Sequence, residues 1–448
     1  MSKKNSVPVA AAVLLAVTAM SAVSLLAAGA ASVAARQREA RPAATSTTAR
    51  SAAVTAATAE VLRQTSELRK LPVLRAVRSG TQSRAEIERM ILRKMDESST
   101  PEETRAAEQA LKKLGLIPAD FQLRPFIVKL LTEQVAGYYD TKTHGFHLAD
   151  WISLEEQRTV MAHELTHALQ DQHFNLRRFE HWPKGDADAE LAAEALIEGD
   201  ATLAMTFYAM RYPALSGVLK SSDEADDEES DELKRAPRAL RELLLFPYEH
   251  GLTWAFQVHK RGGWDGLSQA FTKLPQSTEQ ILHPEKYFAR EAPHKVEAPN
   301  LSTQLGAGWR RTDYDVQGEW GLYLALNEHL ADDAESRKAA AGWGGDRFAL
   351  YEGTQTGDAM IAQITVWDTE QDAREFFDAY TRRTTRRYRA EKIVDTKRGQ
   401  SAVADSDQWK TGEGAVLIER RGSRVAILEG VPEKASARQL MRVLWRQS

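Results

Sequence analysis

The sequence predicts an α+β protein in which a mainly helical region precedes a smaller unit of mixed strands and helices. Before residue 299, apolar residues recur at helical spacing over long runs, and only 135–148 reads as two short strands joined by a polar turn. After that point, short apolar strands alternate with helical runs. The 448 residues suffice for roughly two or three domains. We therefore expect a helical domain over 60–298 with one β-hairpin, and an α+β domain over 299–448.

Composition narrows the classes of function. The chain is 43% hydrophobic and 27% charged, which is typical of a globular protein. Its formal net charge of -4 gives no bulk attraction to nucleic acid, so we expect no nucleic-acid partner. The sequence contains no cysteine, which excludes disulfides, thiol nucleophiles, iron–sulfur clusters and Cys-ligated zinc. Any bound metal must therefore use His, Asp or Glu ligands.

The N-terminus has the pattern of an export signal. Lys3 and Lys4 precede the uncharged, mostly apolar stretch 7–35, in which Val33 and Ala35 fit an A-x-A-like cleavage site. The stretch also approaches the ~20 residues that span a bilayer, so residues 1–35 are a cleaved signal peptide or a membrane anchor. Under both interpretations the body of the protein works outside the cytoplasm, in the periplasm, in the medium or tethered to a membrane.

The next segments predict a tether and a helical entry region. Residues 36–59 are rich in Ala, Thr, Ser and Arg and have almost no large apolar side chain, which predicts disorder. From Glu60 to about residue 116, apolar residues recur near helical spacing and predict helices. The hairpin predicted over 135–148 follows.

Two longer helices are predicted after the hairpin. Ser153 and Glu156 form the pattern of a capping box, and no Gly or Pro interrupts the run up to His173. A second helix is predicted from about residue 187 to Tyr212, because the residue that follows is a proline.

The segment 221–233 is dense in acidic residues and predicts a solvated loop without core residues. A calcium site is the alternative, but the ligand spacing and the glycine of an EF-hand are missing. Further helix is predicted over 240–258, around Pro247.

In the C-terminal unit the apolar pattern predicts strands at 348–351, 360–367, 415–419 and 425–429, and helices at 370–380 and 435–445. Five arginines lie between residues 382 and 389 and predict a solvated helix face. A polyanion site is less favoured, because no aromatic residue beyond Tyr388 is interleaved with them.

The motif with chemical content is the H-E-x-x-H sequence HELTH at 163–167, inside the first of the two long helices. Residues four apart share one face of a helix, so His163 and His167 can offer two imidazole nitrogens to one metal ion, with Glu164 beside them. The alternative is a pair of structural histidines. It is disfavoured because chance gives roughly 0.02 such motifs in a chain of this composition.

A catalytic zinc site needs a third protein ligand and an open position for water. Glu190, Glu194 and Glu198 recur every four residues on the second predicted helix, so spacing permits each of them as the ligand. A solvated acidic stripe is the alternative interpretation. Gly199 indicates a close approach of two backbones, because a glycine inside a helix costs about 1 kcal/mol relative to alanine.

These helices resemble the active-site helices of the gluzincin zinc metallopeptidases. The sequence ALIEGDA at 195–201 is similar to the Glu-Gly-x-Ala box of the aminopeptidase and collagenase branches, although Ile197 stands where the aminopeptidases have Asn. The resemblance covers roughly 125–290 and includes the strings FPY, GGW and STEQILHPEKY, as in uncharacterised bacterial members of the group. It implies a zincin-like fold, one Zn²⁺ per chain, and Glu198 as the third ligand.

The resemblance also implies an activity. The substrate would be a peptide or protein that binds by strand addition to an edge strand at 146–148. Glu164 would take a proton from a zinc-bound water, whose pKa lies near 7, and pass it to the leaving amine. The candidates for a second electrophile that stabilises the developing oxyanion are Tyr248, His250, His283 and Tyr287. Asp171 is either an acid that orients His167 or an exposed residue at the helix end.

We therefore expect an exported zinc metallopeptidase. The main alternative is a non-catalytic envelope protein in which zinc only connects the helices and the C-terminal unit binds a partner. A third interpretation is a metal hydrolase that acts on non-peptide bonds. Glu164 favours catalysis over the structural alternative, because a structural site of two His and one Glu needs no base beside the metal.

Overall fold

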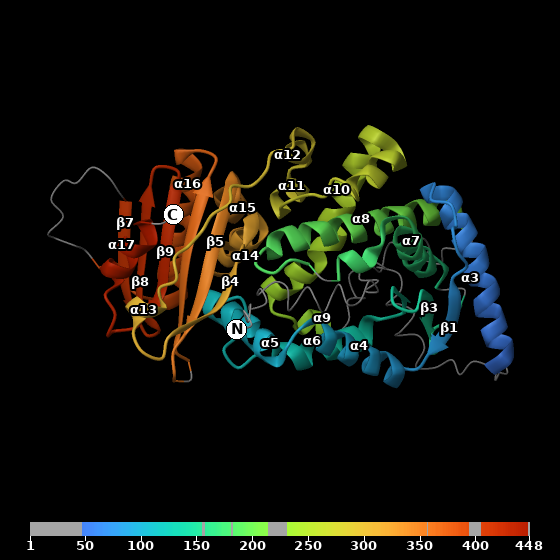
Figure 1. Cartoon of the computed structure of the whole chain (residues 1–448), viewed down its shortest axis with the longest axis horizontal. Helices are drawn as coiled ribbons and strands as arrows, with labels where there is room; N and C mark the ends of the chain where they lie inside the picture. The colour runs from blue at the N-terminus through green and yellow to red at the C-terminus, as the bar shows by residue number, and fades with distance from the viewer. Residues whose placement is uncertain are drawn as a thin grey trace, which may run out of the picture.

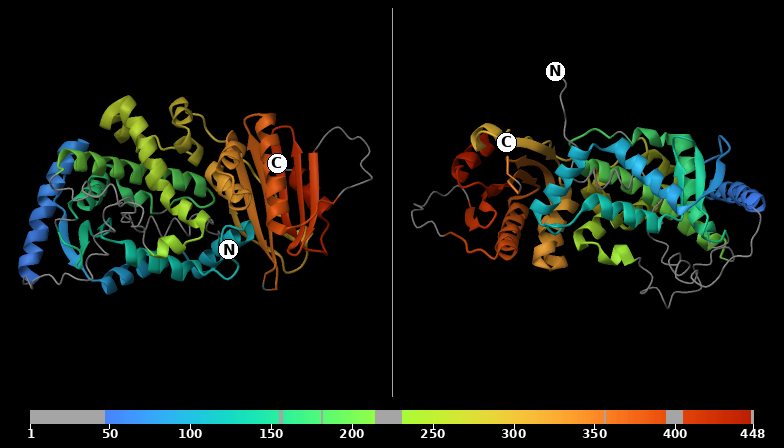
Figure 2. Two further views of the ribbon diagram at one scale, coloured as in Figure 1. Left: turned by 180° about the vertical axis from the view of Figure 1, so that it is seen from behind. Right: turned by 90° about the horizontal axis from the view of Figure 1, so that it is seen from below.

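The computed structural model describes residues 47–154, 157–180, 182–213, 231–355, 357–393 and 405–446. Figure 1 shows an elongated molecule with a mainly helical region at one end and a β-sheet at the other. The two further views in Figure 2 show the same division. The protein is thus a mixed α+β protein, as the sequence predicts.

The helical region extends from α3 to α12, and the long predicted helices are present in it. Its elements are α3 (Thr47–Arg69), β1 (Arg78–Gln82), α4 (Arg84–Ser98), α5 (Pro101–Leu114), α6 (Leu123–Gln134), β2 (Gly137–Asp140), β3 (Gly145–Ala149), α7 (Arg158–Phe174), the 3-10 helix η1 (Leu176–Arg178), α8 (Ala187–Arg211), α9 (Asp231–Arg235), α10 (Arg238–Ala270), α11 (Thr278–Leu282) and α12 (Pro284–Ala289). Helix α10 continues through Pro247 and has a non-helical residue at Gly263.

Strands β2 and β3 form the predicted hairpin, and they belong to a three-stranded sheet with the order β1-β3-β2. The predicted edge strand at 146–148 is therefore wrong, because β3 pairs with β1 on one side and β2 on the other. The edge strand next to α7 is β2. Strand β1 has the sequence RSGTQ, which lacks the apolar alternation by which strands are recognised.

The predicted disordered tether is wrong for residues 47–59, which form most of helix α3. Val54, Ala57 and Val61 are buried together with Met161 and Leu165 of α7. Alanine has the highest helix propensity, and small side chains let α3 lie close to α7, so this segment needs few large apolar residues. Residues 36–46 lie outside the described part of the chain.

The predicted acidic loop is wrong at its C-terminal end. Residues 221–230 lie outside the described residues, but α9 begins at Asp231. Leu233 of this helix is 3% exposed and belongs to the main hydrophobic core. The prediction failed because the acidic composition of the segment outweighed its single buried apolar residue, Leu233.

The C-terminal unit is built on an antiparallel six-stranded sheet with the order β4-β5-β6-β9-β8-β7. Its elements are α13 (Ser302–Leu305), β4 (Arg310–Asp315), α14 (Gly318–Leu330), α15 (Asp333–Ala340), β5 (Trp343–Glu352), β6 (Ala359–Trp367), α16 (Glu370–Tyr388), β7 (Asp405–Thr411), β8 (Gly414–Arg421), β9 (Arg424–Val431) and α17 (Ala437–Arg446). The four predicted strands are the four central ones. The two edge strands, β4 and β7, were not predicted, because their polar sequences RRTDYD and DSDQWKT lack a continuous apolar pattern.

Alternate residues of the sheet pack into different cores. In β9, Val425 and Ile427 join the core beneath α14 and α16, whereas Ala426 and Leu428 face α17. This period of two is the pattern of a sheet covered on both faces. Val296 and Ala298 already belong to the α17 side, so the C-terminal packing unit begins a few residues before the predicted boundary at 299.

The predicted solvated face of arginines on α16 is wrong for two of them. Arg383 is fully buried, and the side chain of Arg387 is 6% exposed. Both guanidinium groups pair with Glu429 of β9 and donate to backbone carbonyls at the end of α5, Arg383 to Leu114 and Arg387 to Lys113. These carbonyls have no partner within their own helix, so the arginines cap α5.

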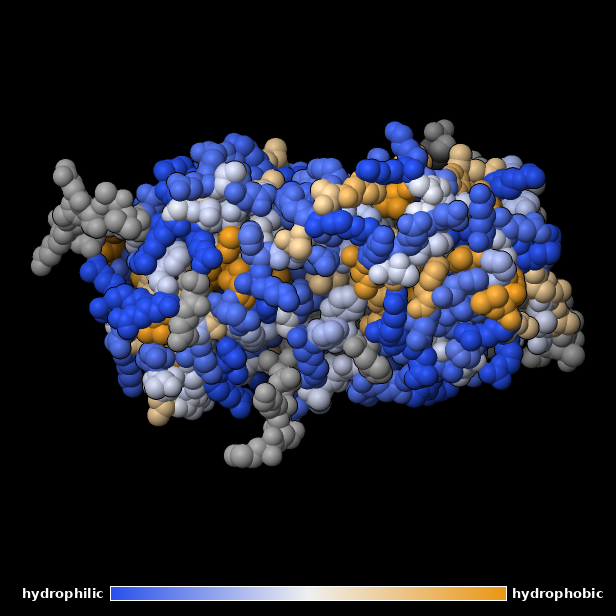
Figure 3. Space-filling view, turned by 45° about the horizontal axis from the view of Figure 1, so that its top comes forward, coloured by the Kyte–Doolittle hydropathy of each residue, from blue (hydrophilic) through white to orange (hydrophobic). Residues whose placement is uncertain are grey.

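The surface is mostly hydrophilic, with small scattered apolar patches on the face that Figure 3 shows. The large apolar side chains that are exposed in the described residues are Val73, Leu74, Met210, Phe256 and Ile393. In the part of the chain that the structure describes, no helix combines the length and the apolar character needed to cross a membrane.

Candidate metal centre

Helix α7 presents the H-E-x-x-H motif from the interior of the helical region. It begins at Arg158, five residues after Ser153, so the predicted N-cap at Ser153 is wrong, and Glu156 of the capping-box pattern lies outside the described residues. Every residue from Thr159 to Asp171 is buried. The helix is enclosed because α3, α8 and β2 all pack against it. The two histidines are therefore interior groups whose ring nitrogens need partners.

Helix α8 brings Glu198 to the histidines, and a close crossing with α10 determines its position. A Cβ atom added at Gly199 would lie 2.2 Å from the backbone oxygen of Gly251, and one added at Gly251 would lie 2.4 Å from the oxygen of Ala195. The two helices therefore touch backbone to backbone, as the mid-helix Gly199 predicts. This crossing also places Tyr248, one turn before Gly251, near Glu198.

The donor atoms of the three predicted ligands converge. His163 Nε2 lies 3.1 Å from His167 Nε2 and 3.1 Å from Glu198 Oε2, and His167 Nε2 lies 3.5 Å from the same carboxylate oxygen. Ligands about 2.0–2.1 Å from a tetrahedral zinc ion lie roughly 3.3 Å apart. All three side chains are buried, and no other His-containing group of this kind occurs among the described residues. The donor set of two imidazoles and one carboxylate therefore fits zinc.

The buried Glu198 carboxylate and the two histidines strongly affect one another's protonation. Burial would raise the pKa of Glu198, but the neighbouring His167 and His163 lower it to about 2. Burial would lower the pKa of His167, but Glu198 raises it to about 9. The buried carboxylate is thus held ionised by a proton on the imidazole. A metal ion at the same three atoms would supply the positive charge in place of that proton.

Glu164 lies beside the three ligands and has one free oxygen. Its Oε2 accepts a hydrogen bond from the backbone N–H of Tyr139 in β2 at 3.2 Å, while its Oε1 is buried and has no hydrogen-bond partner. Burial raises the pKa of this carboxyl well above its usual range. The edge strand β2 therefore orients Glu164 and leaves one basic oxygen available for a proton.

Of the predicted second electrophiles, the structure brings only Tyr248 to the site. Its ring stacks on that of His163, with 6.3 Å between the centroids, and its hydroxyl is buried without a hydrogen-bond partner. Burial, together with the charges of Glu198 and Glu164, raises its pKa well above the usual value. The hydroxyl therefore keeps its proton and remains a hydrogen-bond donor.

The other three candidates make their contacts elsewhere. His283 Nε2 lies 2.9 Å from Glu319 Oε1, and the Tyr287 hydroxyl donates to the Lys273 carbonyl at 2.9 Å. The ring of His250 packs against those of Phe246 and Trp320, which also contact each other. Neither His283 nor Tyr287 bonds to the three predicted ligands or to Glu164 in the structure, so their assignment to the site stays a prediction without structural support. Histidine and tyrosine side chains can both stabilise an oxyanion. The sequence around His283 and Tyr287 does not reveal, however, which helix face they occupy.

The prediction for Asp171 is wrong in both of its forms. The residue is 6% exposed, so it is not a solvated acid, and it bonds to Arg75, Tyr139 and Leu176 rather than to His167. The partner of His167 is instead Gln170, whose Oε1 lies 2.9 Å from His167 Nδ1. Gln170 lies three residues after His167 on the same helix, and this spacing is the sequence signal that could have identified it.

Glu190 and Glu194 share the helix face of Glu198 but are not ligands. Both are 4% exposed, so the solvated-stripe alternative is wrong for them. Neither carboxylate oxygen of Glu194 has a hydrogen-bond partner, and burial raises its pKa well above the usual value. Among the three glutamates, only Glu198 has histidines beside it to balance a negative charge.

A second cluster of carboxylates already contains a cation. Glu279, Glu291 and Asp368 lie close enough together to hold a metal ion, but the Lys286 ammonium lies 2.7 Å from each of them. A lysine that pairs with all three acids replaces a metal there. The cluster of His163, His167 and Glu198, midway along α7 and α8, is thus the stronger candidate metal centre among the described residues.

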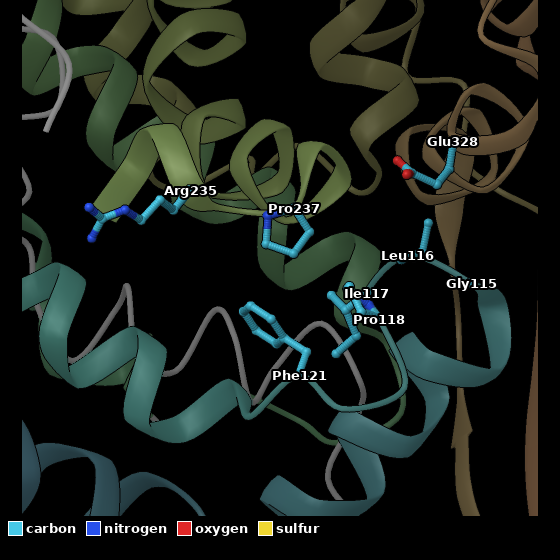
Figure 4. Close-up of a pocket in the computed structure, with 8 residues that line it drawn as sticks. All are labelled: Gly115, Leu116, Ile117, Pro118, Phe121, Arg235, Pro237 and Glu328. Atoms are coloured by element: carbon cyan, nitrogen blue, oxygen red, sulfur yellow. The ribbon is translucent and has the colours of Figure 1, made fainter. Parts of the chain in front are cut away.

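A separate hollow of about 410 Å³ lies beside the loop that follows α5, with Arg235 and Glu328 at its opposite ends (Figure 4). Both charged side chains have partners, since Glu328 pairs with Arg238 at 3.3 Å and Arg235 with Glu232 at 3.0 Å. Its lining includes none of the metal-site residues.

The C-terminal unit matches a known family. Residues 303–441 match the family model of a domain of unknown function, DUF8575. No curated protein and no solved structure matches the chain. The matched segment begins after the last residue of the metal centre, so it assigns no chemistry to this site.

Proposed function

We propose that the protein is an exported zinc-dependent metallopeptidase with a gluzincin-type, zincin-like catalytic region. The observation that carries this proposal is the convergence of three buried donor atoms, His163 Nε2, His167 Nε2 and Glu198 Oε2, at separations of 3.1–3.5 Å. The unpartnered oxygen of Glu164 supports a hydrolytic site, because it is a base with no structural hydrogen bond to make.

The residues then have distinct roles. When bound by these three ligands, zinc supplies a Lewis acid that lowers the pKa of a coordinated water to about 7. Glu164 accepts a proton on Oε1 and later gives it to the leaving amine of the cleaved peptide bond. The Tyr248 hydroxyl donates a hydrogen bond to the substrate carbonyl oxygen as negative charge develops on it. The backbone of β2 fixes the orientation of Glu164 throughout.

The substrates on this proposal are peptides or proteins outside the cytoplasm. The basis for export is the N-terminal pattern of Lys3, Lys4 and the apolar stretch 7–35, which lies outside the described residues. The purely structural alternative is less favoured, because a zinc ion that only connects helices would leave the buried Oε1 of Glu164 without a purpose.

Glu164→Gln tests catalysis without knowledge of the natural substrate. The amide keeps the shape and the hydrogen bond from Tyr139 but cannot accept the proton, so we expect unchanged zinc content, a similar melting temperature and peptide cleavage lowered by 10²- to 10⁴-fold. The measurement is cleavage of an unfolded-protein or peptide library by the zinc-loaded protein. Equal cleavage by the wild type and the variant would show that Glu164 is not the base.

A further inference from the structure

A chain of buried hydrogen bonds connects the N-terminal helix α3 to the metal centre. Arg69, the last residue of α3, donates from Nε to Asp200 Oδ1 at 2.6 Å and from Nη2 to Asp200 Oδ2 at 3.1 Å. Both side chains are fully buried. Arg69 also lies over the ring of Trp264 in α10, so its position is fixed from two sides. Asp200 is two residues after Glu198 on α8.

Gln170 connects this ion pair to His167. Its Nε2 donates to Asp200 Oδ2 at 2.9 Å and to the Ile197 carbonyl at 3.0 Å. Both amide hydrogens are thereby used, which fixes which end of the amide is nitrogen. The remaining atom, Oε1, lies 2.9 Å from His167 Nδ1.

The direction of the last hydrogen bond follows from this arrangement. A carbonyl oxygen only accepts, so Nδ1 of His167 must carry the hydrogen. In neutral His167 the lone pair is then on Nε2, the atom that faces His163 and Glu198. Groups that fix the tautomer of a histidine ligand in this way typically account for 10- to 100-fold in metal affinity.

We propose that Arg69, Asp200 and Gln170 are positioning residues that hold His167 in its metal-binding tautomer and orientation. Helix α3 is therefore part of the metal centre, although it contributes no ligand. Arg69 compensates the buried charge of Asp200, and Asp200 in turn fixes the Gln170 amide. This proposal rests on the zinc site proposed above.

The test measures the zinc dissociation constant by competition with a chelator. Gln170→Leu removes the acceptor of His167 Nδ1 and should weaken zinc binding by about 10- to 100-fold. The double variant R69M/D200L removes the ion pair without leaving a buried unpaired charge, and such replacements often preserve stability. We expect it to fold like the wild type and to bind zinc about tenfold more weakly. Arg63→Met is the matched control on α3, because Arg63 pairs only with Glu67 at the surface and should leave zinc affinity unchanged.

A spectroscopic readout on the wild type does not depend on the stability of any variant. Nitrogen-15 NMR of the zinc-loaded protein should show His167 with its hydrogen on Nδ1. A hydrogen on Nε2, or wild-type zinc affinity in both Gln170→Leu and the double variant, would overturn the positioning role and leave the proposed enzyme intact. A wild type that binds no zinc would instead overturn the proposed function together with this inference.

Discussion

Three glutamates on one face of α8 have different surroundings and therefore different protonation. Glu198 faces two histidines, and its pKa is lowered to about 2 against the effect of burial. Glu190 lies two turns earlier, where burial and the charge of Asp186 raise its pKa to about 8. The sequence spacing placed all three on one face but could not rank them, because the difference arises from residues of another helix. Neighbouring charge, rather than residue type, distinguishes Glu198, the proposed ligand, from the other two glutamates.

Glu190 gives a prediction about pH and stability. Its pKa is about 8 in the folded protein and near its usual 4.5 in the unfolded chain, so between these values the folded state keeps a proton that the unfolded state has lost. The free energy of unfolding therefore falls as the pH rises through this window, by on the order of 1.4 kcal/mol per pH unit, and levels off above pH 8.

Glu190→Gln should remove this pH-dependent loss of stability. The unfolding free energy of the variant should therefore exceed that of the wild type by an amount that grows from pH 5 to pH 8. Urea unfolding at several pH values measures it. Glu88→Gln, at an exposed position of α4, serves as the control. Parallel stability curves for Glu190→Gln and the wild type would contradict the protonated state of Glu190.

At the level of elements, the crossing of α8 and α10 brings groups of the candidate metal centre together. The contact depends on the absence of side chains at Gly199 and Gly251, and it brings Glu198 and Tyr248 to the same space. Helix α7 supplies the remaining groups, and β2 orients Glu164. The site is thus formed by three helices and one strand from separate parts of the helical region.

Gly199→Ala should separate the two helices. The new Cβ would meet the Gly251 backbone at 2.2 Å, and backbone cannot rotate away, so we expect a loss of about 1–3 kcal/mol or more in unfolding free energy together with weaker zinc binding. Chemical denaturation and zinc competition measure both effects. Gly262→Ala is the matched control, because a Cβ there meets nothing within 4 Å and alanine favours a helix. A Gly199→Ala protein as stable as the control would contradict the close crossing.

The sequence predicted the elements whose apolar residues recur at a fixed period. It missed the elements that form only because of contacts with distant parts of the chain. Helices α8 and α10 and the four central strands of the large sheet are recognisable, because their apolar residues recur at a fixed period. Strands β1, β4 and β7 are polar segments that pair only at the edges of sheets. The candidate ligands His163, His167 and Glu198 and the candidate base Glu164 come from a local motif and a resemblance, and the structure brings them together. Gln170, Asp200 and Arg69 were not predicted, because their function depends on contacts between α3, α7 and α8.

At the scale of the whole molecule, the C-terminal unit contacts the helical region at several places, and two of these contacts hold the ends of α5 and α8. Arg383 and Arg387 of α16 cap the end of α5 and are themselves held by Glu429. The start of α8 is bound as well, because the Ala187 N–H donates to Asp315 Oδ1 of β4 at 2.9 Å. The helix that carries Glu198 therefore begins against the C-terminal unit and ends near α3. Helix α8 is thus held near both of its ends, by Asp315 of β4 at its start and by Gln64 of α3 through Tyr208.

X-ray absorption at the zinc edge, on protein loaded with zinc, tests the central claim most directly. The account predicts about one zinc per chain, with two imidazole nitrogens and carboxylate oxygen at about 2.0–2.2 Å. Glu198→Ala should lose most of the zinc, whereas Glu194→Ala, one turn away on the same helix, should retain it. A wild-type protein that holds no zinc after resupply, or an equal loss from the two glutamate variants, would contradict the metal centre described here.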